Sequence, residues 1–249
     1  MRKACTMKKN DPVKKIASEI VSLLFPIRCP VCDEAVKRKE GRICQGCRSR
    51  LKEVEEPFCL SCGRPLPGEK EEYCVDCAGK KHKYIRGRAL YEYESAAESI
   101  YRFKYGGRRE YAMFFGKEMA EKLGGFIRKA APDALVPVPV SRKRFGRRGY
   151  NQAQLLAEVI GAELGIPVYA HLAVRVRDTL PQKELNARER QNNLKRAFKI
   201  IENDVKLSTI IIIDDIYTTG STMDALAEIF LQSGVKKVYF AVLSVGSRG

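Results

Sequence analysis

The segment from Ile210 to Thr222 constrains the fold of this chain more than any other part of the sequence. It reads Ile-Ile-Ile-Ile-Asp-Asp-Ile-Tyr-Thr-Thr-Gly-Ser-Thr. A run of β-branched apolar residues that is too short to cross a membrane is typical of a parallel strand buried on both faces. Apolar residues at helical spacing begin at Met223, so the segment predicts a strand, a loop and a helix. Asp214 and Asp215 then lie at the carboxyl end of the strand.

Two adjacent carboxylates followed by a hydroxyl-rich loop predict a site for a phosphorylated sugar. Asp214 and Asp215 can accept hydrogen bonds from a pair of vicinal hydroxyls. The amides and hydroxyls of the loop can surround a phosphate, and its residues are Thr218, Thr219, Gly220, Ser221 and Thr222. A ribose 5-phosphate fits this order of groups, whereas the acid pair alone is also compatible with an ordinary buried strand and a capping turn. The segment lacks the Gly-x-x-x-x-Gly-Lys-Ser/Thr spacing of a nucleotide P-loop, which argues against an ATPase.

Eight cysteines form four C-x-x-C pairs that repeat every 15 residues. They are Cys29, Cys32, Cys44, Cys47, Cys59, Cys62, Cys74 and Cys77. Because two such pairs supply the four thiolates of a tetrahedral Zn²⁺ site, the sequence predicts two structural zinc sites. Pairing of neighbouring C-x-x-C turns gives two zinc ribbons, and an interleaved arrangement that joins the first turn to the third is the alternative. No secretory signal is visible, so disulfides are disfavoured and the cytoplasm is the expected compartment.

Length and periodicity predict an α/β domain preceded by a smaller module in a chain of 249 residues. We expect an amphipathic helix within residues 1–28, the double zinc ribbon in residues 29–80 and the α/β domain in residues 84–249, with residues 79–83 as a linker. The N-terminal helix is expected to pack on the protein, and peripheral contact with a membrane is the alternative. Further predicted elements are strands within 89–93, 134–140, 167–176 and 235–245, helices within 96–123 interrupted at 106–107, and a helix at 152–164.

The net charge of +16 predicts attraction to a polyanion, such as nucleic acid, acidic lipid or a polyphosphate. One segment is especially basic and follows the strand predicted at 134–140. Its cations are Arg142, Lys143, Arg144, Arg147 and Arg148. We expect this segment to form a loop that binds the phosphate groups of a ligand. A solvated basic loop and contact with nucleic-acid phosphates are the alternatives.

The pattern from Asp214 to Thr222 resembles the signature that binds 5-phosphoribosyl-1-pyrophosphate (PRPP) in type I phosphoribosyltransferases. The resemblance implies that the acid pair holds the ribose hydroxyls and that the loop holds the 5-phosphate. In such a domain the basic loop can cover the pyrophosphate and its Mg²⁺. A polar segment at 175–193 is expected to act as a lid that brings Arg190, or Arg188, to the pyrophosphate. The residues expected at the pyrophosphate are therefore Arg142, Lys143, Arg147, Arg148 and Arg190.

Motifs along nearly the whole chain occur in an order that is typical of one family. They are Phe25-Pro26-x-x-Cys29-x-x-Cys32, Val136 to Pro139, Arg147 to Gln152, then Arg175, Gln182, Arg190, Asn193 and Ala197-Phe198, and finally Ile213 to Thr222. Together they resemble the ComF family of competence-associated proteins, which join a double zinc ribbon to a phosphoribosyltransferase-type domain. The resemblance implies a Rossmann-like type I phosphoribosyltransferase fold with a parallel sheet, PRPP and Mg²⁺ as ligands, and a role in natural transformation.

Two functions are compatible with these features. In the first, the protein binds PRPP and handles incoming single-stranded DNA in the cytoplasm beside DNA-uptake or helicase proteins, with the zinc ribbons and basic loops holding DNA or a partner. In the alternative, it is a catalytically active phosphoribosyltransferase of nucleotide metabolism, and the zinc module is only a structural platform. No residue pattern identifies an acceptor for the transfer, so the sequence assigns no catalytic residue.

Overall fold

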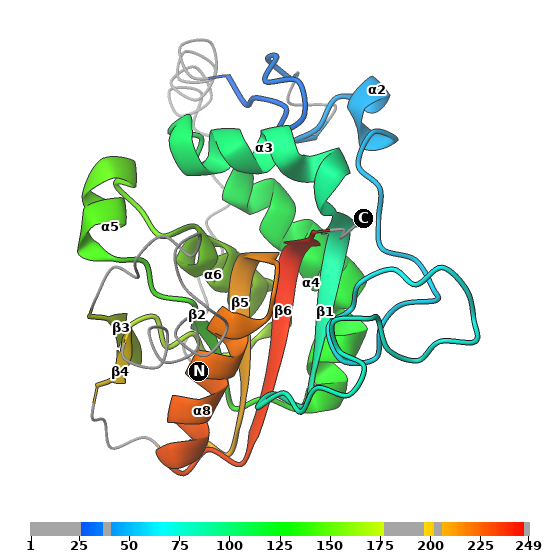
Figure 1. Ribbon diagram of the computed structural model, residues 1–249. Helices are drawn as coiled ribbons and strands as arrows, with labels where there is room; N and C mark the ends of the chain where they lie inside the picture. The colour runs from blue at the N-terminus through cyan, green and yellow to red at the C-terminus, as the bar shows by residue number, and fades with distance from the viewer. Residues whose placement is uncertain (1–25, 37–40, 177–196, 202–205, 247–249) are drawn as a thin grey trace, which may run out of the picture.

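The computed structural model describes residues 26–36, 41–176, 197–201 and 206–246. Four parallel strands form the central sheet in the order β1, β6, β5, β2 (Figure 1). Their bounds are Arg86–Glu92 for β1, Lys237–Val245 for β6, Thr209–Tyr217 for β5 and Ala134–Pro137 for β2. The prediction of an α/β domain with a parallel sheet is confirmed.

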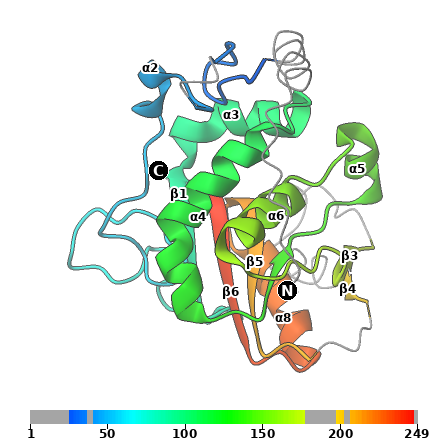
Figure 2. The ribbon, with the colours of Figure 1, turned by 180° about the vertical axis from the view of Figure 1, so that it is seen from behind.

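Helices cover both faces of the sheet, which explains the apolar run in β5. They are α3 (Tyr93–Tyr105), α4 (Tyr111–Ala130), α6 (Gln152–Leu164) and α8 (Ser221–Gln232). Helices α4 and α6 lie on one face (Figure 2), and α8 lies on the other (Figure 1). Ile211 and Ile213 pack in a core with α4 and α6, whereas Ile210 and Ile212 pack with Met223 of α8. A strand whose alternate side chains enter two cores has to be apolar on both faces.

The basic segment after β2 is a helix, α5 (Arg142–Arg148), and not the loop that we expected. The hydroxyl of Ser141 caps its first turn by accepting a hydrogen bond from the N–H of Arg144 at 3.4 Å. Gly149, with a φ of 77°, closes its last turn. No residue of α5 is buried, so the segment carries no apolar periodicity that predicts a helix.

A small antiparallel ribbon stands beside the sheet and consists of β3 (Ala173–Arg175) and β4 (Phe198–Ile200). Residues 177–193 of the predicted lid, including Arg188 and Arg190, lie outside the described residues, as do residues 1–25 of the segment in which we expected the N-terminal helix. Among the described helices, none has the length and apolar character that crossing a bilayer requires.

The described part of the zinc module contains one short helix, α2 (Gln45–Arg48). The two halves of the module contact different parts of the α/β domain. The first half lies over α3, and the second lies beside β1 (Figure 1). The N–H of Gly87 in β1 donates to the carbonyl oxygen of Ser61 at 2.8 Å. Residues 79–83, which we predicted as a linker, are themselves bonded to the α/β domain, because the N–H of Lys83 donates to Oδ1 of Asp224 at 2.8 Å.

Candidate functional site

A cavity of about 260 Å³ opens at the carboxyl end of β5. Five of the predicted site residues line it, namely Asp214, Asp215, Thr218, Thr222 and Arg148. Cations from three other elements complete the wall, and these are Lys104 of α3, Arg144 and Arg148 of α5, and Arg175 of β3. The cavity therefore combines acids suited to sugar hydroxyls with cations suited to phosphates.

Asp214 and Asp215 lie in different environments although they are adjacent. Nζ of Lys104 is 2.8 Å from Oδ1 of Asp215, whose side chain is 9% exposed. Oδ1 of Asp214 accepts a hydrogen bond of 2.8 Å from the N–H of Asp215. Burial and the negative charge of Asp215 raise the pKa of Asp214 to about 7, although Lys104 and Arg175 oppose the shift. A ligand that brings hydroxyl donors or a cation to Asp214 would relieve this repulsion.

The loop between β5 and α8 is shaped by Gly220. This residue has a φ of 76° and forms the N-cap of α8. A Cβ at this position would lie 2.5 Å from the hydroxyl oxygen of Tyr217, so only glycine fits. Thr219 Oγ1 and Ser221 Oγ share a hydrogen bond of 2.9 Å across the turn. The loop thus presents the first N–H groups of α8, which have no acceptor within the helix, next to the acid pair.

The second half of the zinc module supports the outer side of this loop. Nη2 of Arg64 donates to the carbonyl oxygen of Thr218 at 2.9 Å, and its Nη1 pairs with Asp76 at 2.6 Å. Nζ of Lys80 lies 3.5 Å from the carbonyl oxygen of Thr219. Because the C=O and N–H of a trans peptide point in opposite directions, these contacts turn the next two N–H groups away from the zinc module. Successive N–H groups with a common direction form an anion-binding nest.

The predicted phosphate-binding cations are divided between different surfaces. Arg148 lines the cavity at the acid pair, together with Arg144 one turn earlier on α5. Arg142 and Lys143 line a neighbouring cavity of about 670 Å³. Arg147 lines neither of these two cavities. The helical form of α5 accounts for the division, because its side chains project in several directions around the helix axis.

Lys104 is the site residue that sequence reasoning missed. It lies in the last turn of α3 and reaches the acid pair only because α3 crosses the end of the sheet. The only signal for it was a group of cations around Gly106, which does not distinguish Lys104 from Arg108. The structure separates the two, since Arg108 pairs with Asp33 of the first zinc ribbon at 2.6 Å.

Four thiols gather in each half of the zinc module. The Sγ atoms of Cys29, Cys32, Cys44 and Cys47 lie within 4.8 Å of one another, and so do those of Cys59, Cys62, Cys74 and Cys77. The Sγ–Sγ distance is 3.7 Å in both Cys32–Cys44 and Cys62–Cys74. A tetrahedral site with Zn–S bonds of about 2.3 Å has sulfur atoms about 3.8 Å apart, so both clusters fit structural Zn²⁺. Sequential pairing of the C-x-x-C turns is confirmed, and the interleaved arrangement is wrong.

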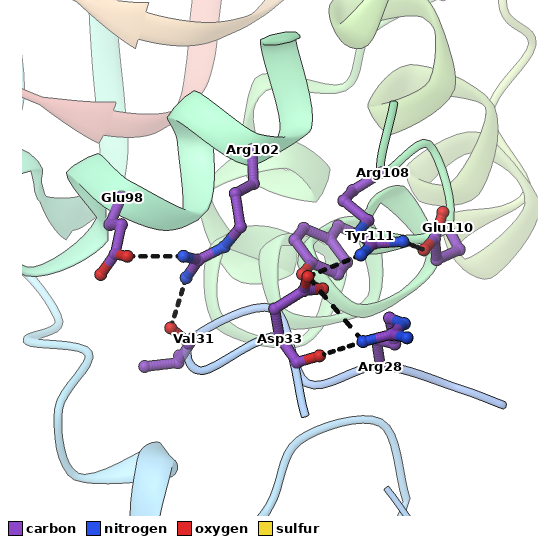
Figure 3. A network of polar contacts seen from close by, with 8 residues as sticks. All are labelled: Arg28, Val31, Asp33, Glu98, Arg102, Arg108, Glu110 and Tyr111. Atoms are coloured by element: carbon purple, nitrogen blue, oxygen red, sulfur yellow. Dashed lines mark hydrogen bonds and ion pairs between the residues drawn. The ribbon is translucent and has the colours of Figure 1, made fainter. Parts of the chain in front are cut away.

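Polar contacts fix the first zinc ribbon to α3 and α4 (Figure 3). The hydroxyl of Tyr111 donates to Oδ1 of Asp33 at 2.5 Å, and Nη2 of Arg108 donates to Oδ2 at 2.6 Å. Nη2 of Arg102 donates to the carbonyl oxygen of Val31 at 2.5 Å. Burial alone would raise the pKa of Asp33, but the bonds from Tyr111 and Arg108 hold it below its ordinary value. The ribbon therefore meets the helices through an ionised carboxylate.

Comparison with known proteins identifies both parts of the chain. The double zinc ribbon domain matches residues 20–78, and the phosphoribosyl transferase domain matches residues 153–248. Competence protein F of Haemophilus influenzae is 37% identical over 109 residues, which are 43% of this chain and 48% of that protein. Competence protein ComFC of Bacillus subtilis is 30% identical over 154 residues, which are 60% of this chain and 59% of that protein. The chain is therefore similar to ComF proteins.

A further relative of this chain is the DNA utilization protein YhgH of Salmonella typhi. It is 40% identical over 107 residues, which are 43% of this chain and 47% of that protein. The chain thus spans about half the length of the curated relatives that it matches. The resemblance to ComF proteins and the fold class expected from the motifs are confirmed.

Proposed function

We propose that this protein binds PRPP with Mg²⁺ at the Asp214–Asp215 cavity and handles incoming single-stranded DNA in the cytoplasm during natural transformation. One observation carries the PRPP part, namely that the acid pair, the Gly220 loop and Lys104 meet at a single cavity. The names of the relatives, competence and DNA utilization proteins, support the DNA part. The arrangement of eight cysteines as two zinc sites, and not as disulfides, supports a reducing compartment.

Each group of the site has a role in this proposal. Asp214 and Asp215 accept hydrogen bonds from the ribose hydroxyls, and the loop from Thr218 to Thr222 donates to the 5-phosphate. Arg144 and Arg148 supply positive charge for the pyrophosphate. Mg²⁺, held by carboxylate and phosphate oxygens, would neutralise part of the ligand's charge. The pyrophosphate contacts of Arg142, Lys143, Arg147 and Arg190 stay predictions.

The alternative function is transfer of the phosphoribosyl group to an acceptor. It is favoured by the neighbouring cavity of about 670 Å³, which shares Pro139, Val140, Asn151 and Arg175 with the cavity at the acid pair. An acceptor in that space would lie beside the bound sugar. Release of pyrophosphate from PRPP in the presence of single-stranded DNA or nucleobases would support transfer, whereas PRPP binding without release supports a binding protein.

Titration calorimetry with PRPP and Mg²⁺ tests the proposal. The double variant Asp214→Asn, Asp215→Asn should bind PRPP at least about a hundredfold more weakly, because each carboxylate bond to a hydroxyl contributes about 1.5–3 kcal/mol. Asp133→Asn is the matched control, since Asp133 accepts from the N–H of Thr209 at the opposite end of β5. Equal affinity of wild type and double variant, with both folded by circular dichroism, would refute the PRPP site.

A further inference from the structure

Three exposed aromatic rings lie close to the cationic helix α5. Tyr101 and Tyr105 are 64% and 62% exposed, one turn apart on α3, and their ring centroids are 5.2 Å apart. The guanidinium carbon of Arg148 is 4.8 Å from the centroid of Tyr105, and its Nη2 donates to the Tyr105 hydroxyl at 3.0 Å. Phe145 of α5 is 49% exposed. Helices α3 and α5 therefore present rings and guanidinium groups on adjoining surfaces.

The cations of α5 differ from several arginines elsewhere in this protein. Arg48, Arg64, Arg102 and Arg108 each pair with a carboxylate. In contrast, no carboxylate among the described residues lies within ion-pair distance of any cation in Arg142–Arg148. A helix with five cations in seven residues, and with no carboxylate partner in the described part of the chain, leaves its charge for an external polyanion.

The positive charge of the whole chain is concentrated in the part that contains α3 and α5. Residues 81–176 contain eighteen Lys and Arg against nine Asp and Glu. Residues 26–80, which include the zinc module, contain eleven Lys and Arg against ten Asp and Glu. The zinc module is thus almost neutral, and it is a poor electrostatic surface for nucleic acid.

We infer that single-stranded DNA binds across α3 and α5, with Tyr101, Tyr105 and Phe145 stacking on bases. Arg142, Lys143 and Arg147, which lie outside the acid-pair cavity, contact the phosphates. A duplex keeps its bases stacked on one another and out of reach of the rings, so the surface fits a single strand. This inference rests on the proposed function, and it assigns the DNA contact to the α/β domain in place of the zinc ribbons.

Fluorescence anisotropy with a labelled oligothymidylate tests the role of the rings. Tyr101→Ala and Phe145→Ala should each weaken binding at least about fivefold, because stacking of one base contributes about 1–3 kcal/mol. Tyr73→Ala is the matched control, since Tyr73 is a 47% exposed ring on the second zinc ribbon. Tyr101 does not line the acid-pair cavity, so Tyr101→Ala should retain the PRPP affinity of the wild type.

The salt dependence of the same binding tests the cations. Replacement of Arg142, Lys143 and Arg147 by Gln should reduce the slope of log affinity against log salt by about 2, since each phosphate contact on a single strand contributes about 0.7. Replacement of Lys129, Lys236 and Lys237 by Gln removes the same charge from exposed positions on other elements and should leave the slope nearly unchanged. Thermal melting of each variant checks that it is folded.

The outcomes separate this inference from the proposed function. If wild type binds the oligonucleotide and the α3 and α5 variants bind it equally well, the surface is wrong but DNA handling stands. If only Tyr73→Ala weakens binding, the zinc module is the DNA surface and the inference is overturned. If wild type does not bind single-stranded DNA at all, the DNA part of the proposed function fails as well.

Discussion

At the scale of single residues, the fold places two adjacent carboxylates in unequal positions. Asp215 has Lys104 at 2.8 Å, whereas burial and the charge of Asp215 raise the pKa of Asp214 to about 7. The folded protein therefore binds a proton at Asp214 more tightly than the unfolded chain does. Ionisation of Asp214 consequently reduces stability as the pH rises from the ordinary aspartate pKa of 3.8 towards about 7, and the loss persists above that pH.

Asp214→Asn should accordingly stabilise the ligand-free protein at high pH. The side chain is partly exposed, so we expect a gain of about 1 kcal/mol at pH 8, or about 2–4 °C in Tm, and a smaller gain at pH 5. Asp215→Asn is a control with the opposite expected effect. It removes the ion-pair partner of Lys104 and should therefore lower Tm. Melting without Mg²⁺ or PRPP measures both. A gain for Asp214→Asn that does not grow between pH 5 and pH 8 would contradict the raised pKa.

At the scale of elements, the second zinc ribbon orients the loop at the start of α8. The bond from Arg64 to the Thr218 carbonyl directs the following N–H towards the anion site. Arg64→Gln should therefore weaken PRPP binding about tenfold, because a hydrogen bond from a charged group contributes about 1.5–3 kcal/mol. Calorimetry measures the affinity, and a colorimetric zinc assay should show two Zn²⁺ per chain, as the two clusters predict.

Arg48→Gln is the matched control for that prediction. Arg48 belongs to the first ribbon and bonds to Glu118 of α4, away from the phosphate loop. The variant Arg48→Gln loses the same charge as Arg64→Gln, and its affinity for PRPP should equal that of the wild type. If Arg64→Gln retains both zinc and full PRPP affinity, the ribbon does not position the loop.

Periodicity predicts an element only where one of its faces is buried. Helix α6 begins at Gln152 and ends at Leu164, as expected, because its apolar residues pack against the sheet and Gly165 ends it. Strand β5 was equally predictable from its apolar run, since both of its faces are covered. Helix α5 escaped prediction because its caps, Ser141 and Gly149, define it without a buried face.

At the scale of the whole molecule, local patterns predict two modules but not how they meet. The contacts that join them link residues far apart in sequence, such as His82 with Asp224 at 2.9 Å and Arg48 with Glu118 at 3.2 Å. The fit is also close, because a Cβ on Gly63 would lie 2.9 Å from Cα of Arg88 in β1. Such contacts depend on the tertiary arrangement, and no spacing within either segment predicts them.

Because these contacts join the zinc module to the α/β domain, we expect zinc to stabilise the phosphoribosyltransferase-type domain as well as the ribbons. Structural zinc sites contribute about 10–16 kcal/mol to folding in isolated modules, so removal by a chelator should lower the melting midpoint of the whole chain by at least about 10 °C. Circular dichroism at the helical minimum isolates the effect on the α/β domain, because the described zinc module contributes only the four-residue α2. Added Zn²⁺ should restore the midpoint. If the melting midpoint of the helical signal stays constant after complete zinc release, the two modules fold independently.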